Sequence, residues 1–186
     1  MDQIKKYVMR KEFLIGFIIA AFFLVYALFF KPNPWLRINV NKLQAAKAES
    51  ALTIEAPKEV DGVGRKFKVN IVMDTFGNSV NAVQSYLEFD PKVLEIISTT
   101  TEQSFCKFYP ENNYNNEKGQ IKLSCGTPYP GFRGVNTLEV IEFSAKAIQT
   151  TTLKLTADSM VLANDGKGTN LLKDIPSAEI KIKAGL

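Results

Sequence analysis

Histidine is absent from this 186-residue sequence, and cysteine and tryptophan are scarce, with two copies and one. Without imidazole the chain lacks the usual base of catalytic triads, which excludes histidine-based acid–base catalysis. A glycine-rich loop of the kind that holds phosphates is also missing. Two carboxylate pairs remain, Glu88 with Asp90 and Glu139 with Glu142, but both lie in alternating, strand-like segments where carboxylates usually face water. We therefore expect a protein that is not an enzyme.

A basic surface is missing from most of the chain, although the formal net charge is +4. The first 48 residues contain eight Lys or Arg and two acidic residues, whereas the remaining residues contain 15 Lys or Arg and 17 acidic residues. The positive charge thus belongs to the N-terminal part. A nucleic-acid-binding domain would need a basic stripe with interleaved aromatic side chains. We expect no nucleic-acid partner.

One long hydrophobic run is present near the N-terminus. Residues 13–30 contain no charged side chain and follow four basic residues, Lys5, Lys6, Arg10 and Lys11. Eighteen helical residues rise about 27 Å, close to the thickness of a bilayer core. Because basic flanks stay inside, we predict a cytoplasmic tail at 1–12, a transmembrane anchor at 13–30 and a spacer at 31–50. The protein is then expected in the cell membrane as a single-pass protein, with a cytoplasmic N-terminus and an extracellular domain.

Two other interpretations of this N-terminus stay open. A cleaved signal peptide would use the Ala46-Lys-Ala48 motif, but the apolar run is longer than usual for a signal peptide and ends well before that motif. A pilin-type leader would be cut after Gly16, but Ala21 stands where such leaders carry glutamate. The lengths favour an uncleaved anchor.

The two cysteines, Cys106 and Cys125, both lie in the part that is expected outside the cell. An even cysteine count in an oxidising compartment favours a disulfide. Two reduced, buried thiols are the alternative. A zinc site would need further ligands, and histidine cannot supply them.

Alternation of apolar and polar residues is the main pattern after residue 50. The segments 66–74 and 81–89 each have one apolar side, formed by Phe67, Val69, Ile71, Met73, Val83, Leu87 and Phe89. In the second segment Gln84, Tyr86 and Glu88 are expected to face outward. The residues between the segments include Gly77 and Asn78, which suit a turn. We predict that the two segments pair as an antiparallel hairpin.

Further strands are predicted at 51–55, 92–98, 120–125, 137–147, 151–156, 160–163 and 178–183. The phase of alternation slips between Val140 and Ile141, which suits a β-bulge. Residues 99–118 and 127–134 are expected to be loops because of their polar, Pro or Gly content. Eight or nine short strands with turns between them predict an all-β fold, an antiparallel β-sandwich in the region 51–186.

The segments 64–95, 138–147 and 162–168 together resemble a cohesin domain. The first carries most of the resemblance, through Gly64, Phe67, Val69, Ile71, Val83, Leu87, Phe89, Asp90, Pro91, Val93, Leu94 and Glu95. The resemblance extends over roughly residues 51–183 and implies a jelly-roll sandwich without catalytic activity. Cohesins imply a protein ligand, a dockerin-type module held by one face of a sheet. The related carbohydrate-binding modules imply a polysaccharide.

Aromatic and amide side chains gather between residues 105 and 132. The candidate ligand-binding residues are Tyr109, Tyr114, Tyr129, Phe132, Asn112 and Asn113. Rings offer rigid contact area for sugars or proteins, and amides offer hydrogen bonds. The alternative is that the rings cover one end of the sandwich and pack on the disulfide.

The segment 164–170 contains Asp165 between Asn164 and Gly166. Its spacing does not fit an EF-hand loop, because Val161 and Ala163 fall where oxygen ligands are needed. A hairpin turn is the simpler interpretation. A looser calcium site with Asp165 and Asp158 stays open, and no other metal or cofactor is expected.

These observations predict a non-catalytic extracellular binding module, tethered to the membrane, that recognises a dockerin-type protein or a polysaccharide. The alternative is a structural subunit of a surface appendage or layer, which has no soluble ligand. Self-association distinguishes the two, since a structural subunit should associate with itself.

Overall fold

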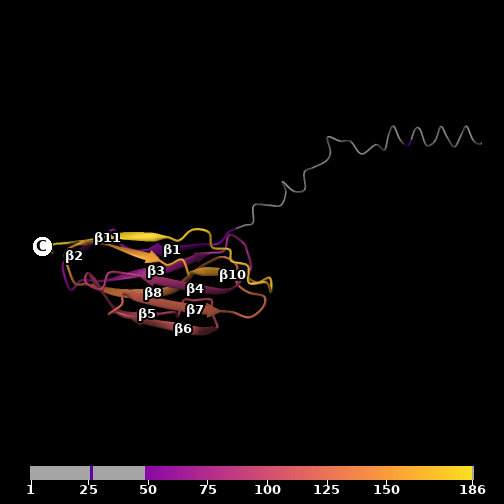
Figure 1. The fold of residues 1–186 in the computed structure, drawn as a ribbon, viewed down its shortest axis with the longest axis horizontal. Helices are drawn as coiled ribbons and strands as arrows, with labels where there is room; N and C mark the ends of the chain where they lie inside the picture. The colour runs from indigo at the N-terminus through magenta and orange to yellow at the C-terminus, as the bar shows by residue number, and fades with distance from the viewer. Residues whose placement is uncertain (1–25, 27–48, 186) are drawn as a thin grey trace, which may run out of the picture. The chain divides into compact units, whose positions relative to one another are not determined.

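The computed structural model describes Tyr26 and residues 49–185, which are coloured in Figure 1. The predicted cytoplasmic tail, all of the predicted anchor except Tyr26, and most of the predicted spacer lie outside the described residues. Within the described part, no helix is both long and apolar enough to cross a bilayer.

Residues 49–185 form an all-β sandwich of two sheets (Figure 1). The first sheet has the order β1 (Ala51–Glu55), β3 (Lys66–Asp74), β8 (Val135–Ala145) and β5 (Leu94–Thr100). The second has the order β2 (Glu59–Asp61), β11 (Ser177–Lys183), β9 (Thr150–Leu155), β4 (Val80–Glu88), β7 (Gln120–Gly126) and β6 (Phe108–Asn115), and β10 (Met160–Ala163) also pairs with β4. The predicted fold class is confirmed, with eleven strands in the described part instead of eight or nine.

The core lies between the sheets and follows the predicted alternation. Val69, Ile71 and Met73 of β3 are fully buried, and Val83 and Leu87 of β4 are nearly so. The two strands therefore turn their apolar sides toward one core. At its centre, the ring of Phe143 on β8 makes an edge contact with Phe89 at 5.3 Å between ring centroids.

The predicted hairpin is wrong in its pairing. β3 pairs with β1 and β8, whereas β4 pairs with β7, β9 and β10 in the other sheet. The connection 75–79 therefore crosses from one sheet to the other. Its two ends bind the same segment, since Thr75 N–H donates to the Gly134 carbonyl and Val80 N–H donates to the Phe132 carbonyl. An amphipathic pattern fixes which side of a strand is buried but not which strand lies beside it.

The segment 99–118, predicted to be a loop, contains β6. Among the strands of the described part, this one lies at the edge of the second sheet and pairs with β7 alone. An edge strand tolerates proline because one side of its backbone has no partner strand, and Pro110 lies within β6. The short strand β2 was also not predicted, and it pairs in parallel with β11.

A β-bulge is present in β8 as predicted, but it lies at Leu138 and not between Val140 and Ile141, where the phase slip was placed. Ile71 of β3 lies opposite Glu139, and the next residue, Val72, lies opposite Thr137, so that Leu138 is the extra residue. Leu138 and Glu139 are both buried, and Glu139 is only 1 % exposed. The expectation that Glu139 faces water is therefore wrong, because the bulge shifts the phase of the strand.

Burial changes the acidity of Glu139. Removal from water disfavours the carboxylate and raises its pKa from 4.5 to about 7, against the opposing effect of a hydrogen bond with Thr99. Its Oε1 atom has no hydrogen-bond partner among the described residues. Glu139 is thus a buried acid whose proton is held until near-neutral pH.

Candidate ligand-binding face

The outward side of the second sheet carries three rows of polar side chains across β4, β7 and β6. Directly paired residues of antiparallel strands point to the same side of a sheet. The rows are Gln84–Ser124–Glu111, Tyr86–Lys122–Asn113 and Glu88–Gln120–Asn115. We call these nine residues the polar face.

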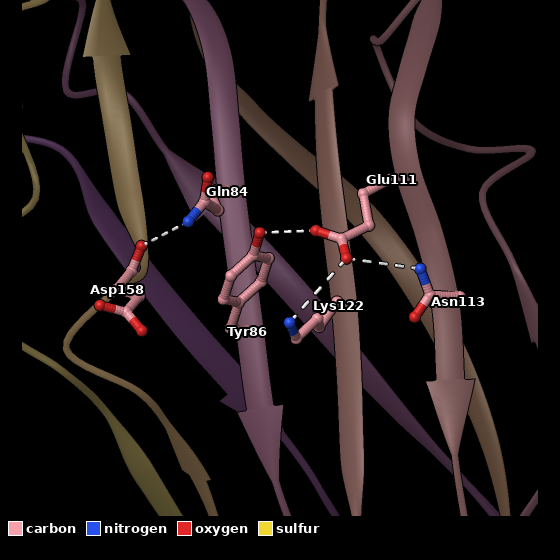
Figure 2. A network of polar contacts seen from close by, with 6 residues as sticks. All are labelled: Gln84, Tyr86, Glu111, Asn113, Lys122 and Asp158. Carbon is pink, nitrogen blue, oxygen red and sulfur yellow. Dashed lines mark hydrogen bonds and ion pairs between the residues drawn. The ribbon is translucent and has the colours of Figure 1, made fainter.

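Tyr86 lies at the centre of the polar face and is held by its neighbours (Figure 2). Its hydroxyl donates a hydrogen bond of 2.5 Å to Oε2 of Glu111, whose side chain extends from β6 over the intervening strand β7. The other oxygen of Glu111 lies 3.5 Å from the Asn113 amide and 4.0 Å from the Lys122 ammonium. The same ammonium lies 5.2 Å from the centroid of the Tyr86 ring. The ring is therefore held in position before any ligand arrives.

The charges of this network are set by the Tyr86–Glu111 hydrogen bond. The donated hydrogen bond favours the carboxylate and lowers the pKa of Glu111. The same hydrogen bond raises the pKa of Tyr86, because the phenol must keep its proton to donate it, and the negative charge of Glu111 adds to this effect. At neutral pH the proton stays on Tyr86 and the negative charge on Glu111. Next to the Tyr86 ring the face thus presents an anion, Glu111, and a cation, Lys122.

The polar face is hollowed beside Tyr86, where β4 changes partners. β10 pairs with β4 up to Gln84, and β9 pairs with it from Leu87 onward. Between them the Tyr86 backbone N–H donates to the Ser159 hydroxyl, and its carbonyl accepts from Thr156 N–H. A depression of about 170 Å³ is lined by Tyr86, Leu87, Glu88, Gln120, Ile121, Lys122, Thr156 and Asp158.

Four of the predicted binding residues, Tyr109, Asn112, Asn113 and Tyr114, lie on β6, and the structure separates them. Asn113 belongs to the polar face. Asn112 and Tyr114 lie opposite Leu123 and Ile121, whose side chains are buried, and thus point to the other side of the strand. Sequence proximity brought these residues together in the prediction, but the alternation of the strand divides them.

Tyr109, near the start of β6, and the two predicted residues outside this strand, Tyr129 and Phe132, lie at the end of the sandwich. Phe132 is stacked on Phe105 with ring centroids 4.6 Å apart, and it packs against the core together with Tyr109. Tyr129 is 88 % exposed in the loop after β7. Tyr114 pairs with Ile121 near the start of β7, whereas Tyr129 follows Gly126 at the end of β7. The five residues from Ile121 to Gly126 extend over ~17 Å, so the exposed rings of Tyr114 and Tyr129 are not neighbours.

Replacing Phe132 and Tyr129 in turn should separate packing from exposure. Phe132→Ala removes a stacked, half-buried ring and should lower the free energy of unfolding by about 2–3 kcal/mol. Tyr129→Ala removes an exposed ring and should change it by less than about 0.5 kcal/mol. Urea unfolding of both variants measures this. Equal losses would show that Tyr129 packs as Phe132 does.

Cys106 and Cys125 form a disulfide, as predicted, with their Cα atoms 5.7 Å apart. The bond joins the segment before β6 to the end of β7. Both cysteines are buried. The alternative of two reduced thiols is set aside.

The candidate calcium residues lie on different turns. Asp158 follows β9 beside the polar face. Both oxygens of Asp165 accept hydrogen bonds within their own turn, from Lys167 N–H at 2.9 Å and from the Thr169 hydroxyl at 2.5 Å. These donors, Thr169 first, lower the pKa of Asp165. In the part of the chain that the structure describes, no three acidic or cysteine side chains cluster as metal ligands would.

The polar face was not predicted as a site, because its members are spread over three strands. Tyr86 and Glu111 are 25 residues apart in the sequence. One signal was present: Tyr86 was expected to face outward, and a large ring on the solvated side of a core strand has no packing reason to be there.

Comparison with known proteins gives a family. Residues 50–183 match the sequence profile of the Cohesin domain. Among similar solved structures is the cohesin module from a family 33 glycoside hydrolase of Clostridium perfringens, with 18 % identity, 74 % of this chain covered, 98 % of that chain covered and a TM-score of 0.61. The third cohesin of ScaC from Acetivibrio cellulolyticus, in complex with the ScaB dockerin, has 15 % identity, coverage of 73 % and 99 %, and a TM-score of 0.60.

A third similar structure is a non-cellulosomal cohesin from the hyperthermophilic archaeon Archaeoglobus fulgidus. It has 18 % identity, coverage of 74 % of this chain and 93 % of that chain, and a TM-score of 0.57. No curated protein matches this chain.

Proposed function

The chain belongs to the cohesin domain family, and from this membership we propose that it is a non-catalytic binding module whose ligand is a dockerin-type protein. The match over residues 50–183 carries the proposal, because it spans the whole sandwich from β1 to β11. A similar fold, the third cohesin of ScaC, was solved with a dockerin bound. Dockerin binding is therefore the first function to test.

The polar face is the surface that we assign to the ligand. It lies on strands of a rigid sheet, which hold side chains more accurately than loops do. Tyrosine is enriched at the energetic centres of protein interfaces, and Tyr86 is held between Glu111 and Lys122. The depression beside Tyr86 offers room for a protruding side chain of the partner.

The proposal includes a tether. Residues 13–30 are uncharged and long enough to cross a bilayer, and the basic residues before them favour a cytoplasmic N-terminus. The Cys106–Cys125 disulfide agrees with a sandwich held in an oxidising compartment. The module would then display its polar face outside the cell.

A pull-down with the full-length chain in detergent tests the proposal. The bait is exposed to the surface and secreted fractions of the source organism, with and without soluble polysaccharide, and to purified dockerin modules. Capture of a dockerin-bearing protein despite the polysaccharide supports the proposal. Capture that polysaccharide abolishes favours a carbohydrate module, and recovery of the chain alone favours a structural subunit.

Truncating Tyr86 should weaken ligand binding strongly. Tyr86→Ala removes the central ring and should raise the Kd for the captured partner by about 30-fold, the effect of a ~2 kcal/mol contact. Lys68→Ala on the exposed side of the first sheet is the matched control and should leave Kd unchanged. Tyr86→Phe tells whether the ring or its hydroxyl carries the effect. An unchanged Kd for Tyr86→Ala would remove the polar face as the binding surface.

A further inference from the structure

Two loops are joined by hydrogen bonds at one end of the sandwich, and we call this region the loop end. It consists of residues 75–79 and 127–135. Thr75 N–H donates to the Gly134 carbonyl at 3.1 Å, the Ser79 hydroxyl donates to the Pro130 carbonyl at 2.6 Å, and the Arg133 guanidinium donates to the Gly77 carbonyl. These bonds hold the loops as one body, so that side chains on their tips keep fixed positions.

Phe76 at the tip of the first loop has an unfavourable conformation. Its φ angle is +44°, and the next residue, Gly77, has a φ of +82°. Such a turn suits glycine or asparagine, since other side chains are strained at positive φ. The ring is also 58 % exposed. Turn chemistry therefore does not explain a phenylalanine here, and more than half of the ring is free for a contact outside the domain.

The loop end carries two further exposed apolar side chains. Tyr129 is 88 % exposed, and Val135, the first residue of β8, is 64 % exposed. They flank the segment 130–134 that binds the Phe76 loop. Two aromatic rings and a valine thus project from one rigid end of the molecule.

The chain enters the sandwich at this same end. Ser50 N–H donates to the Leu171 carbonyl at 3.0 Å. Phe76 and Glu49 line one depression of about 110 Å³, together with Ser50, Ala51, Leu52, Lys173, Asp174 and Pro176. The uncharged run 13–30 lies upstream, and 18 residues separate it from residue 49. Eighteen residues reach at most ~60 Å even when fully extended.

We propose that the loop end contacts the phospholipid surface in which residues 13–30 are anchored, with the Phe76 and Tyr129 rings in the headgroup layer. This inference rests on the tether of the proposed function. A short tether keeps the local concentration of the loop end at the bilayer high, so that a few rings suffice for a lasting contact.

The charges at the loop end favour an apolar contact over an electrostatic one. Lys173 forms an ion pair with Glu49, and Asp74 accepts a hydrogen bond from Phe76 N–H. The Arg133 guanidinium is bound to the Gly77 carbonyl. With these charges engaged locally, zwitterionic lipid should be sufficient, and salt should have little effect.

Tryptophan fluorescence in lipid vesicles tests the contact. The full-length chain carrying Trp35→Phe is reconstituted in phosphatidylcholine vesicles, with one new tryptophan as Phe76→Trp, Tyr129→Trp or Ile148→Trp. Ile148 is the control, since it is 61 % exposed but lies in the loop between β8 and β9. Lipid brominated near the headgroup should reduce the fluorescence at positions 76 and 129 about twofold, because interfacial side chains lie within 5–10 Å of that depth. The signal at position 148 should not change.

Flotation of the same vesicles distinguishes the membrane tether at residues 13–30 from the lipid contact of the loop end. Flotation with the vesicles but no quenching at 76 and 129 overturns the lipid contact and leaves the tether intact. Failure to float overturns both. The two tryptophans could instead become shielded from water as the protein concentration rises, without being quenched by bromine. This result would show that a second copy of the chain covers the loop end, and it would also overturn the proposal.

A second variant distinguishes contact from packing. Phe76→Asn replaces the ring with a residue that tolerates positive φ, and should raise Tm by about 2–4 °C through relief of strain. In the same variant, quenching at Tyr129→Trp should decrease. A fall in Tm would show that Phe76 stabilises the fold by packing, and the lipid contact would then lose its main support.

Discussion

Glu139→Gln should abolish most of the pH dependence of this domain's stability between about pH 4.5 and pH 7. The pKa of Glu139 is about 7 in the folded state, against 4.5 as the reference. The folded state therefore keeps a proton that the unfolded state has released, and the free energy of unfolding falls as pH rises through this window. This difference between the folded-state pKa and the reference pKa corresponds to about 3 kcal/mol in the free energy of unfolding. The contribution is fully present below pH 4.5 and lost above pH 7.

Chemical denaturation of both proteins at pH 4.5, 6 and 8 measures this. The wild type should lose about 3 kcal/mol across the series relative to Glu139→Gln, since glutamine stays neutral at every pH. Glu142→Gln, three residues along the same strand and only half-buried, is the matched control and should follow the wild type. Parallel curves for wild type and Glu139→Gln would mean that Glu139 ionises freely in the folded domain.

Removing the disulfide should destabilise the domain by about 3 kcal/mol. The bond closes a loop of about 20 residues, and the loss of chain entropy in the unfolded state gives this magnitude. The paired substitutions Cys106→Ala and Cys125→Ala test the effect without leaving a free thiol. The free energy of unfolding of this variant should be insensitive to reductant, whereas that of the wild type should fall to a similar value when reduced.

Amide hydrogen exchange measures the local effect of the disulfide separately from its effect on global stability. The segment 101–107 should exchange its amide hydrogens faster in the double variant, because Cys106 joins it to β7. The amides of β3 and β8, which belong to the other sheet, serve as an internal reference. A loss of less than about 1 kcal/mol would mean that packing around the two cysteines, and not the covalent link, orders this segment.

Strand faces were predictable from the sequence, whereas strand partners were not. Val69 and Ile71 of β3 and Leu87 of β4 are buried as the alternation indicates. The same alternation arises whether two strands pair side by side or face each other across a core. The connection 75–79 contains turn residues in either case. The pairing of β3 and β4 in different sheets shows that this connection changes sheets, and the bonds of Thr75 and Val80 to the segment 132–134 hold it there.

The candidate site was partly hidden for a related reason. Tyr86 was predicted to face outward, and it does. Its partners Glu111 and Lys122 lie on strands whose register the sequence does not reveal. In addition, Glu111 lies in the segment 99–118, where Pro110 and a run of asparagines argued against a strand. Edge pairing with β7 outweighed those propensities.

Glu139 shows how a single extra residue changes the chemistry of a strand. The phase slip in β8 was visible in the sequence, and the bulge is present. Its predicted place, between Val140 and Ile141, was wrong, because the extra residue is Leu138, which turns Glu139 inward. A shift of one position would have left the carboxylate in water, with no reason for a raised pKa.

The pairing of β1 has a mechanical consequence. Its five residues pair with β3 from Ala51 opposite Asp74 to Glu55 opposite Asn70. The hydrogen bonds of an antiparallel ladder lie perpendicular to the strands. Traction applied at the N-terminal side of β1, along its axis, therefore shears all of these bonds together instead of peeling them one by one. With the proposed N-terminal tether, dragging a bound partner away would make β1 the first strand to bear the load.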